Sequence, residues 1–229
     1  MIGYDKVLSG CPLFWGIGAD ERERVLRCLD GAVQRIAAGQ SIFRAGEPAV
    51  RAGVMLEGAA QIIREEYTGE RTILARLVPG ELFGESFACA RETRLTFPIT
   101  VLSETEGAVL FLDLRRAAAS CSSSCAFHAR LIANLLGILA DKNRVLNRRL
   151  DHLSKRTTRE KLLSYLSEQA AVQGGGEFCI PYNRQELADY LCVERSAMSA
   201  VLGKMRDDGL VRFWKNRFVL LSGAETSLR

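Results

Sequence analysis

A segment near the C-terminus, residues 183–211, carries side chains whose types and spacing suit contact with a polyanion. Its first run with apolar residues at helical spacing, RQELADYL, is separated by a tight turn from a second run, ERSAMSAVLGKMRDDG. Arginine, glutamine and serine side chains stand at the start of these runs, where they can contact phosphates and base edges. The segment therefore predicts two packed helices, of which the second projects its N-terminal polar residues into a major groove of DNA.

The apolar residues of the same segment indicate how the two helices pack. Leu187, Ala188 and Leu191 can lie against the apolar residues that follow the turn, namely Val193, Met198, Val201, Leu202 and Met205. The small side chain of Ala188 permits close contact between the helices. A hairpin over VRFWKNRFVLL, with Lys215 and Asn216 at its tip, is expected to lie beside the DNA backbone as a wing.

A second group of reactive side chains, Cys121, Cys125 and His128, follows steps of four and three residues. These steps place all three on one face if a helix begins before Cys121, where they could form part of a metal site that needs a fourth ligand, or a redox thiol pair. The alternative is that the cysteines are small buried hydrophobic residues, as we expect for Cys179 and Cys192. The seven cysteines are odd in number and irregularly spaced, which predicts reduced thiols rather than a disulfide framework. We assign no residue as a metal ligand.

Composition and charge exclude several classes of protein. The 229 residues are 48% hydrophobic and 25% charged, which is typical of a globular rather than a disordered chain. No apolar stretch reaches the roughly 18 to 20 residues that cross a bilayer, and no leader pattern opens the chain, so we expect a cytoplasmic protein without membrane contact. No catalytic triad, zinc-protease or phosphate-loop motif stands out, and we do not expect an enzyme.

The net charge of +4 is distributed unevenly along the chain. Residues 1–141 hold 15 basic and 17 acidic residues, a net charge of −2, whereas residues 142–220 hold 15 against 9, a net charge of +6. The basic excess therefore lies in the same third of the chain as the two expected DNA-binding helices, although a solvated helix face would also explain it.

The elements that must position these residues begin with short strands over residues 31–113. Glycine and proline divide this stretch into apolar runs, which predict a β-sandwich or small barrel: VQRI, SIFR, GVMLE, AQIIRE, TILARLV, ITVL and AVLFLD.

The pattern then changes to one long helix over residues 125–153, without proline and with apolar residues at steps of three and four. One stripe of this helix is expected to pair with a second copy of the chain, and it consists of Ile132, Leu135, Leu139, Leu146 and Leu153. Further apolar residues widen that face, namely Leu131, Leu136, Ile138 and Val145. The alternative is a helix that packs only on its own barrel.

A second helix follows over REKLLSYLSEQAAV, with Thr157 or Thr158 as its N-cap. The loop QGGGE ends it, a short strand FCIPY comes next, and Asn183 caps the first helix of the two-helix segment. The order after the barrel is therefore helix, helix, strand, two helices and a hairpin.

The chain resembles the CRP/FNR family of bacterial transcription regulators over roughly residues 10–221. The resemblance is carried by AGQSIFRAGEP at 38–48, LEG at 56–58, PGELFGE at 79–85 and the two-helix segment. It implies an α+β fold with an N-terminal cyclic-nucleotide-type β-roll, which is jelly-roll-like, a long dimerisation helix, and a C-terminal winged helix-turn-helix. We place these parts at residues 1–118, 119–154 and 155–229.

The resemblance also implies roles for single residues of the two-helix segment. Arg184 and Gln185 match positions that clamp phosphates, Arg195 and Ser196 match positions that face phosphate and base edges, and Ser199 lies one turn further along. The next position often holds an arginine that reads guanine, but here it is Ala200. The usual half-site sequence of the family therefore cannot be carried over.

At the sensor end, the resemblance assigns Gly84 and Glu85 to an effector site, with Glu85 holding a ribose. The family's phosphate-binding arginine falls at Leu95, followed by Thr96, with Arg94 one residue early. A buried phosphate without a cation is costly, so we predict an effector other than cyclic AMP unless Arg94 supplies the charge after a one-residue shift.

The function implied is that of a dimeric, sequence-specific transcriptional regulator controlled allosterically at the β-roll. Its expected partners are double-stranded promoter DNA, a second copy of the chain, RNA polymerase and a small-molecule effector. The alternative is a metabolite- or redox-sensing module whose DNA-binding half is degenerate, since Ala200 departs from the pattern. The identity of the effector, the operator bases and the choice between activation and repression stay open.

Overall fold

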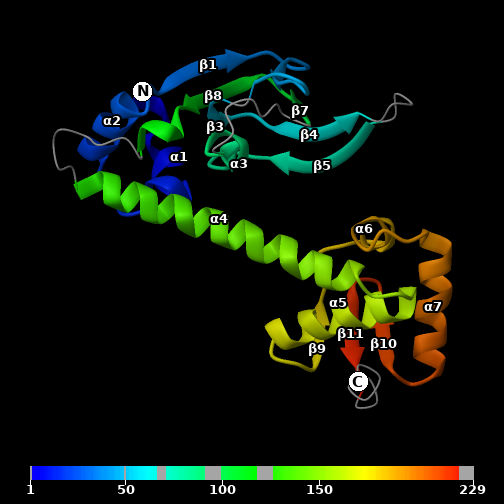
Figure 1. Cartoon of the computed structure of the whole chain (residues 1–229). Coiled ribbons are helices and arrows are strands. Elements are labelled where there is room, and N and C mark those ends of the chain that lie inside the picture. Colours follow the sequence, from blue (N-terminus) through cyan, green and yellow to red (C-terminus); the bar gives the residue numbers. More distant parts are fainter. Residues whose placement is uncertain (1, 49, 66–70, 91–98, 118–125, 222–229) are drawn as a thin grey trace. The chain divides into compact units, whose positions relative to one another are not determined.

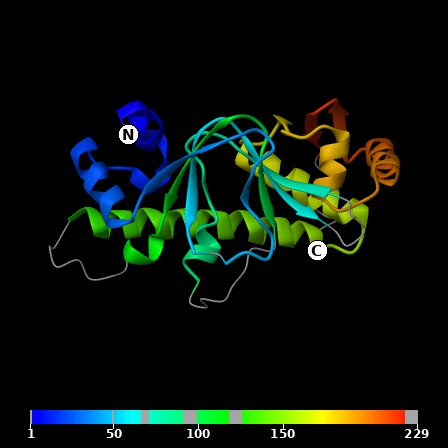
Figure 2. The same cartoon turned by 90° about the horizontal axis from the view of Figure 1, so that it is seen from above.

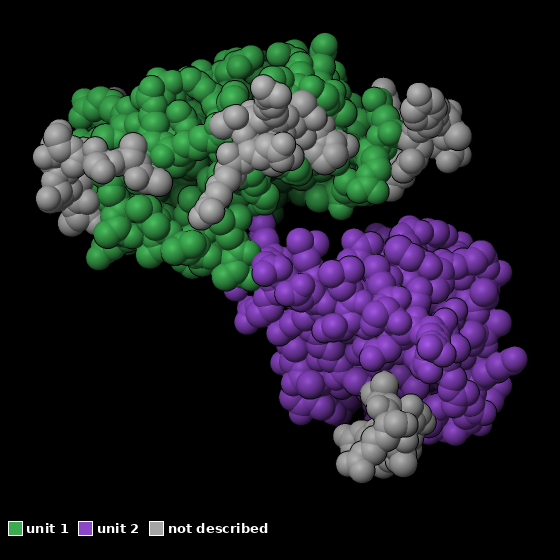
Figure 3. Space-filling view, in the orientation of Figure 1, with its two compact units in different colours: residues 1–140 green, residues 141–229 purple. Residues whose placement is uncertain are grey.

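The computed structural model describes residues 2–48, 50–65, 71–90, 99–117 and 126–221 (Figure 1). The chain divides into two compact units, residues 1–140 and 141–229, which are coloured separately in Figure 3. We call them unit 1 and unit 2 and describe each by itself. None of the helices in the described ranges is both long and apolar enough to span a membrane.

Unit 1 is built on two four-stranded sheets in which every pair is antiparallel. The first sheet has the order β1-β8-β3-β6, with strands at Ala32–Ile36, Gly107–Leu112, Ala52–Glu57 and Leu82–Phe83. The second has the order β2-β7-β4-β5, with strands at Ser41–Phe43, Thr100–Ser103, Ala60–Glu65 and Arg71–Leu77.

One hydrophobic cluster lies between the two sheets, because each of the eight strands contributes one buried residue to it. These are Ile36, Phe43, Met55, Ala60, Leu77, Phe83, Val101 and Val109. Phe43 makes edge-to-face contacts with both Phe83 and Phe111, at centroid distances of 5.4 and 5.8 Å. Gly53 is needed beneath Phe83, since a Cβ there would lie 2.3 Å from the ring. Aromatic rings therefore fill part of the space between the sheets.

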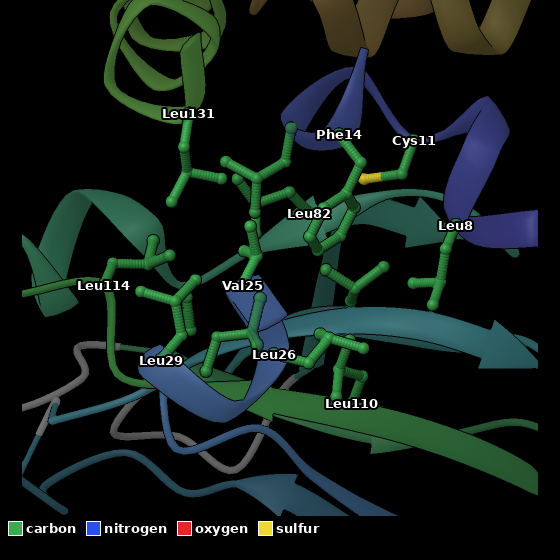
Figure 4. Close-up of a cluster of buried hydrophobic side chains, with 14 of the residues drawn as sticks. Leu8, Cys11, Phe14, Val25, Leu26, Leu29, Leu82, Leu110, Leu114 and Leu131 are labelled. Atoms are coloured by element: carbon green, nitrogen blue, oxygen red, sulfur yellow. The ribbon is translucent and has the colours of Figure 1, made fainter. Parts of the chain in front are cut away.

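A second cluster covers the outer face of the first sheet. Alternate residues of β3 and β8, such as Val54 and Leu110, belong to this cluster, whereas Met55 and Val109 face the other way. Both central strands are thus buried on both faces, which explains their continuous apolar sequences. Figure 4 shows side chains from the N-terminal helices and from the long helix meeting those of the sheet.

The N-terminal helices that supply this cover lie at one end of the sheets in Figure 2. They are η1 (Ile2–Tyr4), α1 (Asp5–Gly10), η2 (Pro12–Phe14) and α2 (Ala19–Cys28). The described part of the unit also contains two short helices, α3 (Glu85–Ala88) and η3 (Leu114–Ala117). The long helix α4, Ala126–Leu153, begins in unit 1, where Asn134 donates to the carbonyls of Leu13 and Trp15 at 3.0 and 2.9 Å.

Unit 2 contains the end of α4, three further helices and a small sheet. The helices are α5 (Thr158–Val172), α6 (Arg184–Tyr190) and α7 (Arg195–Asp207). The sheet has the order β10-β11-β9, with strands at Val211–Trp214, Arg217–Leu220 and Glu177–Cys179. Its core joins the helices to the sheet through residues such as Leu166, Leu187, Met198 and Phe218.

The predicted fold class is confirmed: a β-roll of antiparallel sheets, a long helix and a helix-turn-helix unit with a hairpin. Each of the seven apolar runs contains a strand, Thr157 is the N-cap of α5, and Asn183 caps α6. Sequence reasoning did not predict α1, α2 or the two-residue β6. Strand β6 is too short for an alternating pattern, and it is defined only by its pairing with β3.

Candidate nucleic-acid interface

The two-helix segment is held by local hydrogen bonds that the sequence signals. The side chain of Asn183 accepts from the amide of Glu186 at 3.0 Å, and the carboxylate of Glu186 accepts from the amide of Asn183 at 2.7 Å. The turn after α6 passes through Cys192 with φ of +51°, and the amide of Val193 donates to the carbonyl of Ala188 at 3.0 Å. This tight turn allows α7 to begin at Arg195, five residues after the end of α6 at Tyr190.

Helix α7 has two faces of opposite character. Met198, Leu202 and Met205 are fully buried against α5 and α6, as predicted. The opposite face carries the exposed residues Arg195, Ser196, Ser199, Ala200 and Lys204. The guanidinium of Arg195 has no hydrogen bond or ion pair within the described part of the chain, so its donors are free for a ligand.

Both serines of this face donate their hydroxyl protons within the helix. Ser199 Oγ donates to the carbonyl of Arg195 at 2.9 Å, and Ser196 Oγ donates to the carboxylate of Glu194. With their protons committed in this way, the two hydroxyls present lone pairs outward and act as acceptors.

Glu194 is a functional residue that sequence reasoning missed. Its carboxylate caps α7 by accepting from the amides of Ser196 and Ala197 at 2.9 and 2.7 Å. These hydrogen bonds, first those from Ser196, lower the pKa of Glu194 to about 2. Because a carboxylate already occupies the N-terminal amides, the start of α7 is not a free phosphate site. An acidic residue directly before the helix was the available signal.

Arg184 and Gln185, the expected phosphate contacts, lie at the start of α6 in different settings. The Arg184 guanidinium stacks over the rings of Phe213 and Phe218, 4.9 and 5.1 Å from their centroids. Burial lowers the pKa of Arg184, and stacking leaves the edge of its guanidinium to donate. The amide of Gln185 donates along its own helix to Asp189 at 2.9 Å and is exposed.

The predicted wing is the β10–β11 hairpin. Trp214 pairs with Arg217, and Lys215 at the tip has φ of +52°. Asn216 fastens the tip, since its side-chain amide donates to the carbonyl of Ile180 at 3.1 Å and its own carbonyl accepts from the amide of Ile180 at 2.9 Å. A cavity of about 500 Å³ lies between the start of α6 and this tip, and both Arg184 and Lys215 line it.

The last turns of α4 contact α5 and α6 through polar groups. Arg149 donates to the carbonyl of Tyr190 at 3.3 Å and lies 5.1 Å from the centre of its ring. Lys161 of α5 donates to the next carbonyl, that of Leu191, at 3.2 Å. Cations therefore satisfy the carbonyls at the end of α6, where a helix lacks internal donors.

A buried histidine strengthens the same junction. His152 is 4% exposed; its Nδ1 lies 2.9 Å from Ser164 Oγ, and its Nε2 lies 2.8 Å from a carboxylate oxygen of Glu168. Arg148 pairs with the other oxygen of Glu168 at 3.1 Å. Sequence reasoning did not find this cluster, because α4 and α5 supply its members from positions up to 20 residues apart.

The residues of the predicted dimer stripe differ in their exposure to solvent. Ile132 and Leu146 are exposed, whereas Leu135, Leu139 and Leu153 are half-buried, and Leu135 packs against the unit 1 core. Two further leucines that lie at steps of four from Ile132 and Leu146 are each 61% exposed, namely Leu136 and Leu150. The sequence pattern included Leu136 and missed Leu150.

At the sensor end, Gly84 adopts φ of +76° and Glu85 opens α3. Glu85 is 3% exposed, and one of its carboxylate oxygens accepts from Ser86 Oγ at 3.3 Å. Arg94, Leu95 and Thr96 lie outside the described residues. The structure therefore describes the glycine and the buried carboxylate of the expected effector site without its candidate cation.

The candidate metal ligands are also described only in part. Cys121 and Cys125 lie outside the described residues, and His128 packs beside Phe127 with a buried Nε2. No cluster of three or more potential metal ligands occurs within the described ranges. Cys179 and Cys192, which we expected to be packed inward, are both exposed. Cys179 lies opposite Arg217 in the sheet, and Cys192 lies at the tight turn.

Comparison with known proteins separates the chain into the same two parts. Residues 33–123 match the family model of the cyclic nucleotide-binding domain, and residues 160–224 match that of the Crp-like helix-turn-helix domain. The cyclic AMP receptor protein of Thermus thermophilus is 28% identical over 211 residues, which cover 90% of both chains. The nitrogen fixation regulation protein FixK of Azorhizobium caulinodans is 26% identical and covers 90% of this chain and 82% of its own.

Solved structures agree with this assignment. The catabolite activator protein of Thermus thermophilus superposes with a TM-score of 0.54 at 25% identity, covering 94% of this chain and 96% of its own. The structure of CprK superposes with a TM-score of 0.63 at 13% identity, covering 90% of this chain and 92% of its own, and shows likeness of fold alone.

Proposed function

The chain belongs to the CRP/FNR family of DNA-binding transcriptional regulators, and we propose that it acts as a homodimer that reads a palindromic promoter site under control of a small molecule. Unit 2 reads the DNA, α4 joins two copies, and the β-roll receives the effector. This division corresponds to functional segments 1–118, 119–154 and 155–229. Binding, rather than catalysis, is its activity, and RNA polymerase is the partner that its DNA complex recruits or blocks.

The observation that carries the proposal is the two-faced recognition helix. Its buried side fixes α7 on α5 and α6, and its open side presents Arg195, whose guanidinium makes no hydrogen bond or ion pair within the described chain. Arg195 then meets phosphates and base edges, and the hydroxyls of Ser196 and Ser199 accept from base edges. Arg184 and Gln185 meet the backbone beside the groove. The open face argues against a degenerate DNA-binding half.

The dimer is supported by the exposed leucines of α4. A helix of 28 residues is about 42 Å long, and a single stripe along it contains Ile132, Leu136, Leu139, Leu146 and Leu150. Large exposed apolar side chains at coiled-coil spacing are stabilised when a second copy covers them. Two recognition helices related by a two-fold axis then face two half-sites.

The effector site is proposed at Gly84 and Glu85, together with Arg94 and Thr96. A buried carboxylate next to a left-handed glycine can accept hydrogen bonds from ligand hydroxyls. The neighbouring interior is filled by Phe43, Phe83 and Phe111, so a ligand would contact an apolar wall.

Selection from a random duplex library tests DNA reading. The full chain is used with and without a small-molecule cell extract, and enriched sites are measured by gel shift. We expect a two-fold symmetric site, and we expect Arg195→Glu to abolish the specific band. Arg24→Glu, the same charge change on an exposed arginine of α2, is the matched control and should bind like the wild type. Failure to enrich any site under both conditions contradicts the proposal.

Sedimentation equilibrium tests the dimer. Leu150→Lys places a charge in the exposed stripe and should yield monomers. Val145 is equally exposed, but at helical spacing it lies on another side of α4 from this stripe, although the sequence pattern assigned it to the dimer face. Val145→Lys should therefore leave the dimer intact. A wild-type chain that sediments as a monomer, or equal effects of both substitutions, would contradict the assigned stripe.

A further inference from the structure

The side chains on the most exposed side of α7 are short, and none of them is a long hydrogen-bond donor. Ser196, Ala200 and Gly203 follow steps of four and three residues, on the side of the helix opposite Met198 and Leu202. Ala200 is exposed, and a Cβ built on Gly203 meets no atom within 4 Å. From Ala200 to Gly203 this line of residues therefore presents a methyl group and no side-chain donor, and the hydroxyls of Ser196 and Ser199 lie beside it.

The two serine hydroxyls close to Ala200 already donate their protons within the protein. Ser196 gives its proton to Glu194, and Ser199 gives its proton to the carbonyl of Arg195 at 2.9 Å. Guanine presents two acceptors in the major groove, so it is read by a donor, most often arginine or lysine. The sites around Ala200 offer a methyl group and hydroxyl lone pairs, which do not suit guanine.

An alanine methyl group has one apolar counterpart in the major groove, the C5-methyl group of thymine. We propose that Ala200 makes this protein select thymine at the base pair that it faces in each half-site, while Arg195 selects guanine nearer the start of the helix. This inference rests on the proposed DNA-binding function and assigns the chemistry of its operator. Ala200 is thus a specificity-determining residue that acts by contact with the thymine methyl group.

Lys204 is the competing reader of the same region. It lies one turn beyond Ala200, is exposed, and could reach a guanine with its flexible chain. In the proposed arrangement, Lys204 binds a phosphate, so its removal weakens all sequences alike and lowers the salt dependence of binding.

Deoxyuridine provides the direct test, because it lacks only the C5-methyl group of thymine. The selected operator is synthesised with deoxyuridine at each selected thymine in turn, in both half-sites. At one position the wild-type chain should lose about four-fold in affinity per half-site, equivalent to about 0.8 kcal/mol for one buried methyl group, and about 15-fold for the symmetric site.

Three variants locate the effect. Ala200→Gly should bind thymine and deoxyuridine operators equally, Ala200→Arg should shift selection at that position from thymine to guanine, and Lys204→Ala should keep the wild-type sensitivity to deoxyuridine. Circular dichroism melting checks that each variant is folded.

The outcomes separate the two proposals. If no symmetric site is enriched, the DNA-binding function itself fails. If a site is enriched but deoxyuridine has no effect at any thymine, or has equal effects on the wild type and on Ala200→Gly, the role of Ala200 is overturned while the DNA-binding function stands.

Discussion

The interiors of the two units are stabilised by different kinds of contact. Between the sheets of unit 1, aliphatic and phenylalanine side chains from eight strands form a cluster whose members do not ionise. In unit 2, an apolar core is bordered by His152, Tyr165 and Tyr190, and by cations that cap the end of α6. Apolar contacts stabilise shape without fixing direction, whereas hydrogen bonds fix orientation.

This difference corresponds to what each unit must do. The roll encloses a volume: backbone hydrogen bonds hold its strands within each sheet, and side-chain packing holds the two sheets together. Unit 2 must keep α7 at a fixed angle to the end of α4, because displacement of a recognition helix removes its contacts with bases. Arg149 and Lys161, which bind consecutive carbonyls at the end of α6, are suited to this task. The stability of unit 1 should therefore depend mainly on the volume of its buried side chains, and the stability of unit 2 on hydrogen bonding and pH.

The largest expected effect is in unit 1. Phe83→Ala removes a buried ring that contacts Phe43 and lies over Gly53. The loss should be about 3–5 kcal/mol in the free energy of unfolding of this unit. Hydrogen exchange followed by mass spectrometry localises the loss, which should be confined to the strands. Equal loss of protection in α5–α7 would show that the units do not differ as described.

The next effect is in unit 2. His152→Ala leaves Ser164 and the Glu168 carboxylate without their buried partner. We expect the free energy of unfolding of unit 2 to fall by about 2–3 kcal/mol, which hydrogen exchange should show as faster exchange in α5 and α6. His128→Ala is the control on the same helix, since the buried Nε2 of His128 has no hydrogen-bond partner in the described chain. Unchanged exchange in α5 and α6 for His152→Ala, or an equal increase there for His128→Ala, would mean that the His152 hydrogen bonds do not hold the junction.

A smaller change is expected in the stability of unit 2 at alkaline pH. Burial raises the pKa of Tyr165, Tyr182 and Tyr190 above the usual value. The unfolded chain releases these protons near pH 10 and therefore binds fewer protons than the folded one, so stability is complete below about pH 10 and falls as pH rises above it.

Urea unfolding of unit 2 between pH 8 and pH 11 measures this fall. Tyr165→Phe removes a buried hydroxyl that lacks a partner among the described residues. It should raise the free energy of unfolding by about 1 kcal/mol and flatten the pH dependence. A steeper fall in the variant would contradict the assignment to Tyr165.

The smallest expected effect is that of cyclic AMP on unit 1. The position expected to hold the phosphate-binding arginine is Leu95, so millimolar cyclic AMP should leave the thermal unfolding of unit 1 unchanged. A bound ligand at 100 times its Kd would add about 2.7 kcal/mol. Calorimetry that detects micromolar binding, lost in Arg94→Ala, would instead show that Arg94 supplies the missing charge.

Much of the candidate interface could be predicted because its signals are local. Asn183 and Glu186, three residues apart, cap α6 by direct hydrogen bonds, and the spacing of Met198, Leu202 and Met205 identifies the buried face of α7. The contacts of His152 could not be predicted, because Ser164 and Glu168 belong to another helix. Arg184 was assigned to phosphate by its position, and its stacking on Phe213 and Phe218 depends on a hairpin almost 30 residues away.

The sequence by itself determined which segments become strands and helices and which end of the chain is basic, since periodicity, caps and charge act over a few residues. Only the tertiary structure decided which polar groups are already engaged. Glu194 occupies the start of α7, Arg149 is bound to the end of α6, and Arg195 stays open. The physical reason is that a side chain is available to DNA only if no other segment of the folded chain satisfies it first.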